Sequence, residues 1–168
     1  ILASCAQTEN RVFGEQLSRS QGVVYDNNGP FTGVAFDMHY NKQISKEVTY
    51  KDGIKHGIEA EWYEDGQMEY KTNYVNGKQD GLEQAWSPNG QLDYERTLKN
   101  DDYWGPYKEW YESGKLREEG NFVENNKDGV WKYYYDNGQI QSESIIKDGV
   151  EEIKFYDKEG NLLPEGEC

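Results

Sequence analysis

The sequence has few of the residues that build disulfide frameworks, metal sites or membrane spans. Its only cysteines, Cys5 and Cys168, stand at opposite ends of the 168 residues, which gives neither a disulfide framework nor a metal-ligand spacing. No stretch approaches the roughly 20 apolar residues that a membrane-spanning helix needs. Hydrophobic residues make up only 35% of the chain, which argues against a round core rich in leucine, isoleucine and valine.

Basic residues are also scarce. The chain has 18 lysines and arginines against 32 aspartates and glutamates, for a net charge of −14. The first 28 residues contain two arginines and three carboxylates, so nearly all of the negative charge belongs to residues 29–168. This field disfavours binding to nucleic acid or to an anionic bilayer. We therefore expect no nucleic-acid partner, whereas cationic, neutral and carbohydrate partners stay open.

Aromatic residues and glycine, in contrast, are plentiful. The mean hydropathy of −1.08 would by itself suggest disorder. However, the chain has 14 tyrosines, 5 tryptophans and 18 glycines. Aromatic side chains bury large areas and favour pleated sheets. This mixture predicts a thin, elongated sheet with one apolar face.

The glycines and aromatic residues repeat with a period of 24 residues, which marks a tandem-repeat protein. The turn positions of four copies carry Gly66, Gly90, Gly114 and Gly138, with Lys42 in the first copy. A second glycine series is Gly33, Gly57, Gly81, Gly105 and Gly129. The apolar series are Met38, Trp62, Trp86, Trp110 and Tyr134, then Ile44, Met68, Leu92, Leu116 and Ile140, then Tyr50, Tyr74, Leu98, Phe122 and Ile146.

Each unit reads as a β-hairpin. Apolar residues alternate with polar ones on both sides of the Asp65-Gly66 pair and its equivalents, which is the period of a strand. Asn-Gly and Asp-Gly between such strands are strong hairpin signals because glycine takes positive φ without steric cost. We expect a second, longer turn between units, with Gly53, Gly77 or Gly149 in three copies and Asp101 or Asn125 in the others.

The predicted fold is therefore all-β: an elongated, single-layer antiparallel β-meander in which the tryptophan series and the Ile44–Ile140 series form neighbouring rows. Residues 1–28 are assigned to an N-terminal tether and cap. Residues 29–168 are assigned to five repeats and a degenerate last copy that is two residues short of register. Since one hairpin alone is marginal in water, stability should depend on contacts between neighbouring repeats.

The first residues resemble a lipobox. In bacterial lipoproteins a branched apolar residue and two small residues precede the lipidated cysteine, and Leu2-Ala3-Ser4-Cys5 matches this pattern. The resemblance implies that residues 1–4 end a secretory signal and that Cys5 carries the lipid. It further implies an address in the bacterial cell envelope, at the outer membrane or cell surface, with membrane contact only through that lipid; the alternative is a cytoplasmic protein.

The repeat unit G-x4-W/Y-x3-G-x-L-x2-E-x2-Y, seen in residues 105–122 and 129–146, resembles the bacterial variant of the MORN repeat, as in YwqK-type antitoxin-like proteins. The resemblance covers roughly residues 29–163 and implies a scaffold or an antitoxin that neutralises a partner toxin. A second resemblance concerns residues 131–138, WKYYYDNG, which are similar to the aromatic hairpins of choline- and carbohydrate-binding repeats. Such hairpins hold cationic or sugar ligands on their rings.

No constellation of residues indicates catalysis, a metal or a cofactor. His39 and His56 stand at non-equivalent repeat positions, and no serine has a nucleophile-elbow context. Glu47, Glu95, Glu119 and Glu143 share one repeat position, which predicts either a ladder of like charges or a solvated face. We expect a non-catalytic protein.

The aromatic row is the candidate binding surface. A single-layer sheet has no second layer to cover it fully, so part of it should stay open to a partner. The candidate residues are Trp62, Trp86, Trp110 and Tyr134 with the adjacent Tyr63, Tyr111 and Tyr135. The leading hypothesis is a surface-tethered module for contact with an unknown protein, including pairing at a sheet edge. Carbohydrate or choline binding, and antitoxin-like activity, are the alternatives.

Overall fold

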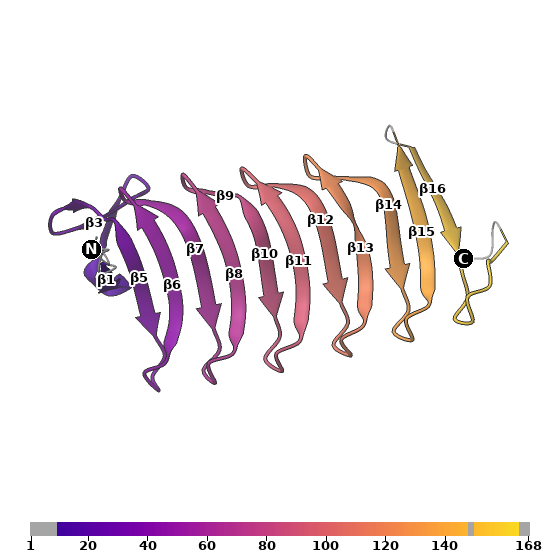
Figure 1. Ribbon diagram of the computed structural model, residues 1–168, viewed down its shortest axis with the longest axis horizontal. Coiled ribbons are helices and arrows are strands. Elements are labelled where there is room, and N and C mark those ends of the chain that lie inside the picture. Colours follow the sequence, from indigo (N-terminus) through magenta and orange to yellow (C-terminus); the bar gives the residue numbers. More distant parts are fainter. Residues whose placement is uncertain (1–9, 148–149, 165–168) are drawn as a thin grey trace, which may run out of the picture.

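The computed structural model describes residues 10–147 and 150–164. Almost all of the regular structure is β, and the only helical turn described is the short 3₁₀ segment η1 (Gly14–Gln16). Figure 1 shows one long sheet in which the strands follow one another in chain order from the N-terminal to the C-terminal end. The predicted antiparallel meander of tandem hairpins is confirmed.

Within the described residues the main sheet has thirteen strands. They are β1 (Arg11–Phe13), β5 (Gly33–Met38), β6 (Ile44–Lys51), β7 (Ile54–Trp62), β8 (Met68–Val75), β9 (Lys78–Gln79), β10 (Gly81–Trp86), β11 (Leu92–Lys99), β12 (Asp102–Trp110), β13 (Leu116–Val123), β14 (Asn126–Tyr134), β15 (Ile140–Lys147) and β16 (Val150–Phe155). The pair β1–β5 is parallel, and the other pairs in the sheet are antiparallel.

A second, three-stranded sheet caps the N-terminal end of the array. It consists of β2 (Ser18–Ser20), β3 (Val23–Asp26) and β4 (Gly29–Pro30). A small apolar core lies under this cap, with Val24 and the fully buried Phe31 packed among Ala35, Val48 and Tyr50 of the first repeat. The cap therefore shields the apolar edge that a first repeat would otherwise expose.

The hairpin turns are placed as predicted. In the second copy the Gly66 N–H donates to the carbonyl of Tyr63 (2.9 Å), and the Tyr63 N–H donates to the carbonyl of Gln67 (2.9 Å). Gly66, Gly90, Gly114 and Gly138 all have φ between 81° and 91°. Lys42 closes the same turn in the first copy with a φ of 69°, so a lysine there adopts a backbone conformation that favours glycine.

The expectation of a longer second turn is wrong. The turn between β6 and β7 has only two residues, Asp52 and Gly53, because Lys51 pairs directly with Ile54. Both turn residues have positive φ, 50° and 76°, as in a type I′ turn. The equivalent pairs are Asn76-Gly77, Asn100-Asp101 and Glu124-Asn125, all with positive φ. The 148–149 pair, which includes Gly149, lies outside the described residues.

The other glycine series bends the sheet rather than closing a turn. Between the pairs Tyr50–Lys55 and Val48–Glu59, three residues of β7 stand opposite one residue of β6, and Gly57 is the middle of the three with a φ of 104°. Such a bulge kinks a strand and increases its twist. Similar register shifts occur between β11 and β12 and between β13 and β14, so the kink recurs along the array.

At the C-terminal end the chain folds back on the edge strand β16. A turn closed by the Gly160 N–H and the Asp157 carbonyl (3.0 Å) repeats the hairpin turn two residues early, as expected from the sequence. Leu163 then donates its N–H to the Phe155 carbonyl (2.8 Å). No helix among the described residues is long and apolar enough to cross a membrane.

Candidate functional site

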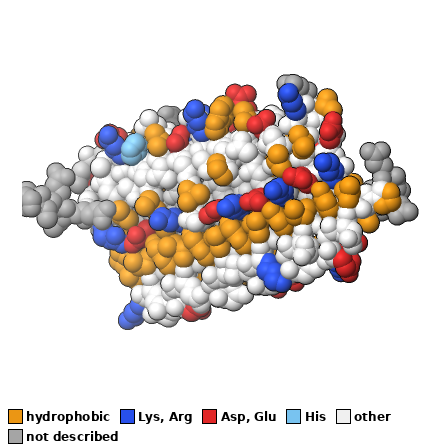
Figure 2. Space-filling view, turned by 45° about the vertical axis from the view of Figure 1, so that its right-hand side comes forward, with side chains coloured by type: hydrophobic (Ala, Val, Ile, Leu, Met, Phe, Trp, Pro, Cys, Tyr) orange, Lys and Arg blue, Asp and Glu red, His pale blue; other side chains and the backbone are white. Residues whose placement is uncertain are grey.

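An apolar stripe runs along one face of the sheet, here called the Trp face. In each hairpin an aromatic residue or methionine of one strand pairs with an aliphatic residue of the next strand, as Trp62 does with Met68 and Trp110 with Leu116. The stripe consists of Met38, Ile44, Trp62, Met68, Trp86, Leu92, Trp110, Leu116, Tyr134 and Ile140. Apart from the more exposed Met38, these side chains are half-buried. The two predicted rows are thus neighbours, and Figure 2 shows them within a continuous orange band.

A charge ladder lies beside the apolar stripe on the same face. Across adjacent strands Glu95 pairs with Lys108, Lys108 with Glu119, and the alternation continues towards the C-terminal edge. The further members are Lys132, Glu143 and Lys154. Figure 2 shows the row as alternating red and blue above the orange band. Of the two alternatives for this glutamate position, the ladder of like charges is therefore wrong, because a lysine from the neighbouring strand separates successive glutamates. Opposite charges that face each other across strands stabilise a sheet.

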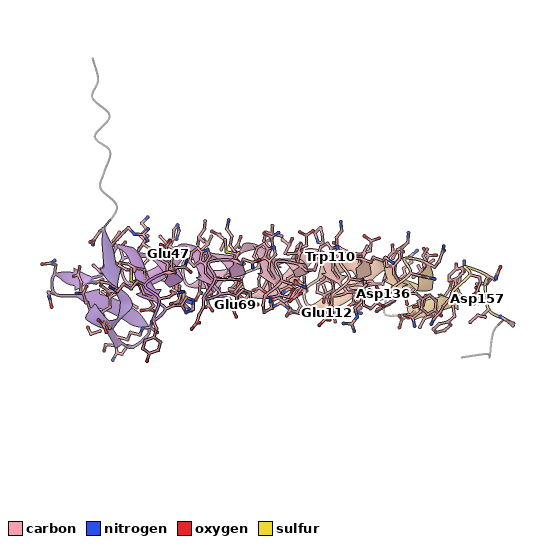
Figure 3. The ribbon with its side chains drawn as sticks, turned by 90° about the horizontal axis from the view of Figure 1, so that it is seen from below. Glu47, Glu69, Trp110, Glu112, Asp136 and Asp157 are labelled. Carbon is pink, nitrogen blue, oxygen red and sulfur yellow. The ribbon has the colours of Figure 1, made fainter. Side chains whose placement is uncertain are left out.

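Exposed aliphatic side chains extend the Trp face beyond the charge ladder. Ile58, Leu82 and Val130 share one repeat position and are 46%, 49% and 47% exposed. Figure 3 labels Glu47 and Trp110 on one face of the sheet and Glu69 and Glu112 on the other. The Trp face thus combines the half-buried stripe, a charge ladder without net excess and an open aliphatic row. This arrangement is typical of an interaction surface.

The tyrosines next to the tryptophan series brace the repeats. The hydroxyl of Tyr63 donates to the backbone carbonyl of Trp86, Tyr111 to that of Tyr134, and Tyr135 to that of Tyr156. These bonds are 2.6, 2.6 and 2.9 Å long, and each joins one repeat to the next. The hydroxyls of these three candidate residues are therefore engaged within the sheet. A role of their half-buried rings in binding stays a prediction.

On the opposite, inner face, Glu59 is buried among lysines. The Nζ atom of Lys46 lies 2.6 Å from Oε1 of Glu59 and 2.6 Å from Oε1 of Glu61, and Lys55 donates to Oε2 of Glu59. Burial opposes ionisation of Glu59, but the hydrogen bonds from both lysines outweigh it and hold the pKa of this carboxyl below its usual value. Glu59 is therefore ionised at neutral pH and links β6 to β7.

One repeat further, Glu83 occupies the equivalent position with a different set of partners. It is 1% exposed and accepts hydrogen bonds from the Tyr70 hydroxyl (2.7 Å), Gln79 Nε2 (2.7 Å) and Arg96 Nε (2.5 Å). The Arg96 guanidinium also stacks 4.7 Å from the ring of Tyr103. Both carboxylate oxygens are bonded to residues of the protein itself. This buried carboxylate is therefore part of the core and is not available to a substrate.

The same repeat position carries an aromatic core in the later copies. Trp131 is 1% exposed and packs against Tyr107 (ring centroids 5.7 Å apart) and Phe122 (5.0 Å). Lys127 Nζ lies 3.9 Å from the Trp131 ring centroid and donates to the hydroxyl of Tyr133 (2.6 Å). The leading tryptophan of the choline-like WKYYYDNG segment is therefore buried, and its cation is a lysine of the same chain.

The inner-face network is the part of the molecule that sequence reasoning missed. Glu59 and Glu83 stand at one repeat position, where later copies have Tyr107 and Trp131. The facing series changes with it, from Arg96 opposite Glu83 to Gly120 opposite Tyr107. A paired change of this kind between two series would have indicated facing side chains.

No catalytic or metal centre emerges from the described residues. Within them no group of three His, Cys, Asp or Glu could hold a metal ion. His39 makes a 2.7 Å hydrogen bond with the Trp62 carbonyl, and His56 accepts the N–H of Asn76 at 3.4 Å, so the two imidazoles serve the repeats separately. Cys5, the predicted lipidation site, lies outside the described residues.

These features define a class: a non-globular repeat module whose broad faces are formed by tandem hairpins. Comparison with protein families matches the MORN repeat variant at residues 55–76, 79–100, 105–124 and 127–148. The chain belongs to this family. The four matches coincide with the second to fifth hairpins, and they indicate a repeat module for interaction with proteins or membranes. No curated protein matches the chain.

Proposed function

We propose that the protein is a non-catalytic scaffold that binds a partner protein along the Trp face. The observation that carries this proposal is the unbroken apolar stripe with an open aliphatic row and a charge ladder beside it. Strands lie about 4.8 Å apart, so the ten strands of the stripe extend roughly 43 Å. A small ligand would cover little of this length, whereas a helix of about 30 residues, rising 1.5 Å per residue, would span it.

The charge of the chain specifies the partner further. The net charge of −14 favours a partner with excess positive charge, which would associate faster at low ionic strength. The ladder contributes alternating charges rather than one sign, so it would fix the register of a bound segment more than its affinity. The expected partner is a protein with an elongated apolar segment flanked by basic residues.

The test removes apolar contact without removing core residues. Leu82→Asp combined with Val130→Asp changes two half-exposed side chains of the aliphatic row, so the sheet should keep its fold. Affinity capture with the wild-type chain should retain a partner that this variant loses, and crosslinks should map to the Trp face. A matched control is Tyr40→Asp, because Tyr40 is fully exposed on a hairpin turn outside the stripe. Equal capture by both variants would refute the proposed surface.

We further propose that a lipid on Cys5 holds the protein at the bacterial cell envelope. The support is the Leu2-Ala3-Ser4-Cys5 pattern and the polar residues 6–10 that follow it. Intact-mass spectrometry of the protein purified from membranes should show a diacylglyceryl addition that Cys5→Ser abolishes. Recovery of an unmodified chain from the cytoplasm would contradict this proposal and leave the Trp face untouched.

A further inference from the structure

A cleft of about 370 Å³ lies between the N-terminal cap and the first two repeats. Its walls come from β2 and β3 of the cap and from the two-residue turns at 52–53 and 76–77. The lining residues that matter here are Arg19, Val24, Tyr50, Ile54, Lys55 and Lys78. The volume falls within the usual range of small-molecule sites, roughly 300–1,000 Å³.

The charge of this cleft is opposite to that of the chain. The protein has 32 carboxylates, yet the described residues that line the cleft include three cations and neither aspartate nor glutamate. Lys55 is held by Glu59 through its Nζ atom. Arg19 and Lys78 form no ion pair with any residue in the described ranges. Two cations are therefore left for a ligand.

Tyr50 supplies a hydroxyl group at the same place. The residue is 4% exposed, and its ring packs 6.1 Å from that of Phe31. Its hydroxyl makes no hydrogen bond with the described residues and is not among their fully buried, unpartnered side-chain atoms, so it is open at the cleft that Tyr50 lines. Burial raises the pKa of Tyr50 while the charge of Arg19 lowers it, and the net effect is upward, so the hydroxyl stays protonated at neutral pH. An accessible phenol hydroxyl without a partner in the protein can donate a hydrogen bond to a ligand.

From the three unused donors and the apolar wall, we infer that this cleft binds a small organic anion: a carboxylate or phosphate ester with an apolar body. Arg19 and Lys78 pair with the anionic group, and the Tyr50 hydroxyl donates to one of its oxygens. Val24 and Ile54 contact the apolar body. The site uses no residue of the apolar stripe, so it is independent of the partner-protein function proposed above.

Calorimetric titration of the full chain with four probes tests the class of ligand. Benzoate and phenyl phosphate should both bind with saturation. Benzyl alcohol, which has the same ring without a charge, should give no saturable signal. Inorganic phosphate, which has the charge without the ring, should bind about tenfold more weakly than phenyl phosphate, since apolar burial of this size is worth about 1.4 kcal/mol.

Single substitutions then test the residues. Arg19→Gln and Lys78→Gln should each weaken benzoate binding about tenfold, the usual effect of losing one charge-assisted hydrogen bond. Tyr50→Phe keeps the packed ring and should weaken binding about fivefold. Lys132→Gln removes an equivalent charge from the Trp face and should leave affinity unchanged. Far-UV circular dichroism of each variant confirms that the sheet has formed.

Two results would overturn the inference. One is the absence of saturable binding of both benzoate and phenyl phosphate by the wild-type chain. The other is saturable binding that the folded Arg19→Gln/Lys78→Gln double variant retains in full, because the anion would then bind elsewhere. Neither result bears on capture of a partner protein by the Trp face, so failure of this site and failure of the proposed function are distinguishable.

Discussion

The hydroxyl of Tyr63 donates a 2.6 Å hydrogen bond to the backbone carbonyl of Trp86, one repeat further along the sheet. The same bond recurs from Tyr111 and Tyr135. Each tyrosine therefore joins two hairpins that are already paired through their strands. In a repeat protein such nearest-neighbour contacts decide whether the array unfolds as a unit.

Ser87 occupies the tyrosine position of the third copy and is too short for the same bond. Its hydroxyl instead donates to Asn89 within its own turn. Ser87→Tyr should let a hydroxyl reach the Trp110 carbonyl and raise the free energy of unfolding by about 1 kcal/mol, the net value of one hydrogen bond. Urea denaturation measures this gain. Ser87→Phe is the control, because it adds the ring without the hydroxyl; equal stability of the two variants would contradict the bracing role.

Lys42 is the one residue of the hairpin-turn series that takes positive φ without being glycine. A side chain in this conformation costs roughly 1 kcal/mol, so Lys42→Gly should stabilise the first repeat by about 0.5–1 kcal/mol in thermal or urea unfolding. The reciprocal change Gly90→Val should destabilise by at least that much, and by more than Gln91→Val. No difference between Gly90→Val and Gln91→Val would mean that the turn backbone carries no constraint.

Much of the fold follows from the repeat period alone. Series such as Trp62, Trp86 and Trp110 predict strands in register, and the structure confirms both the pairing with Met68 and its equivalents and the hairpin turns. The turn between repeats is shorter than the sequence predicts. The reason is that this two-residue turn does not require glycine, so its residues vary from copy to copy. Asn100-Asp101 and Glu124-Asn125 take positive φ at both positions, and the sequence pattern alone does not reveal this for glutamate.

The inner face could not be predicted because the bend at Gly57 is invisible to a period of two. Alternation assigns Glu59 to a face of a flat sheet, where a carboxylate would be solvated. The bulge curves the sheet and buries Glu59 at 4% exposure. Likewise, the repeat position of Glu95, Glu119 and Glu143 taken alone is consistent with a ladder of like charges, and only the strand pairing shows that Lys108 and Lys132 lie between them. Strand pairing, not composition, therefore determines both the burial of Glu59 and the alternation of charges along the ladder.

Glu59 and Glu118 should respond to acid in opposite ways. Hydrogen bonds from lysines outweigh burial and lower the pKa of Glu59, whereas burial and the hydrogen bond with Glu109 raise the pKa of Glu118. At pH 7, Glu59→Gln should therefore destabilise the protein by about 1–3 kcal/mol, the range for losing hydrogen bonds to a charged group. Glu118→Gln should stabilise it by roughly 0.5–1 kcal/mol, because an unfavourable ionised carboxyl is removed.

The pH dependence follows from linkage. The stability that ionised Glu59 contributes is complete above its unfolded pKa, about 4.3, and is lost as the pH falls through its lower folded pKa. The stabilisation that protonated Glu118 contributes is complete below the same unfolded pKa. It is lost as the pH rises through the raised folded pKa of Glu118. Both variants should thus approach the stability of the wild type in acid. Urea midpoints of the wild type and both variants, measured from pH 3 to pH 8, test this. A difference in midpoint between either variant and the wild type that stays constant over this pH range would contradict it.

Gly120 leaves the space that the Trp131 ring fills. A Cβ at Gly120 would lie 2.3 Å from two ring atoms of Trp131, and the φ of Gly120 is not positive, so only sterics oppose a side chain there. Gly120→Ala should therefore destabilise the protein by about 1–3 kcal/mol, the usual cost of overpacking. Gly129→Ala is the contrasting control: its Cβ would meet no atom within 4 Å, and its φ of 71° limits the cost to about 1 kcal/mol of backbone strain. A double-mutant cycle with Trp131→Leu tests whether the effect is steric. If it is, Gly120→Ala should be nearly neutral in the Trp131→Leu variant. An unchanged cost of Gly120→Ala in that variant would show that the destabilisation comes from the backbone.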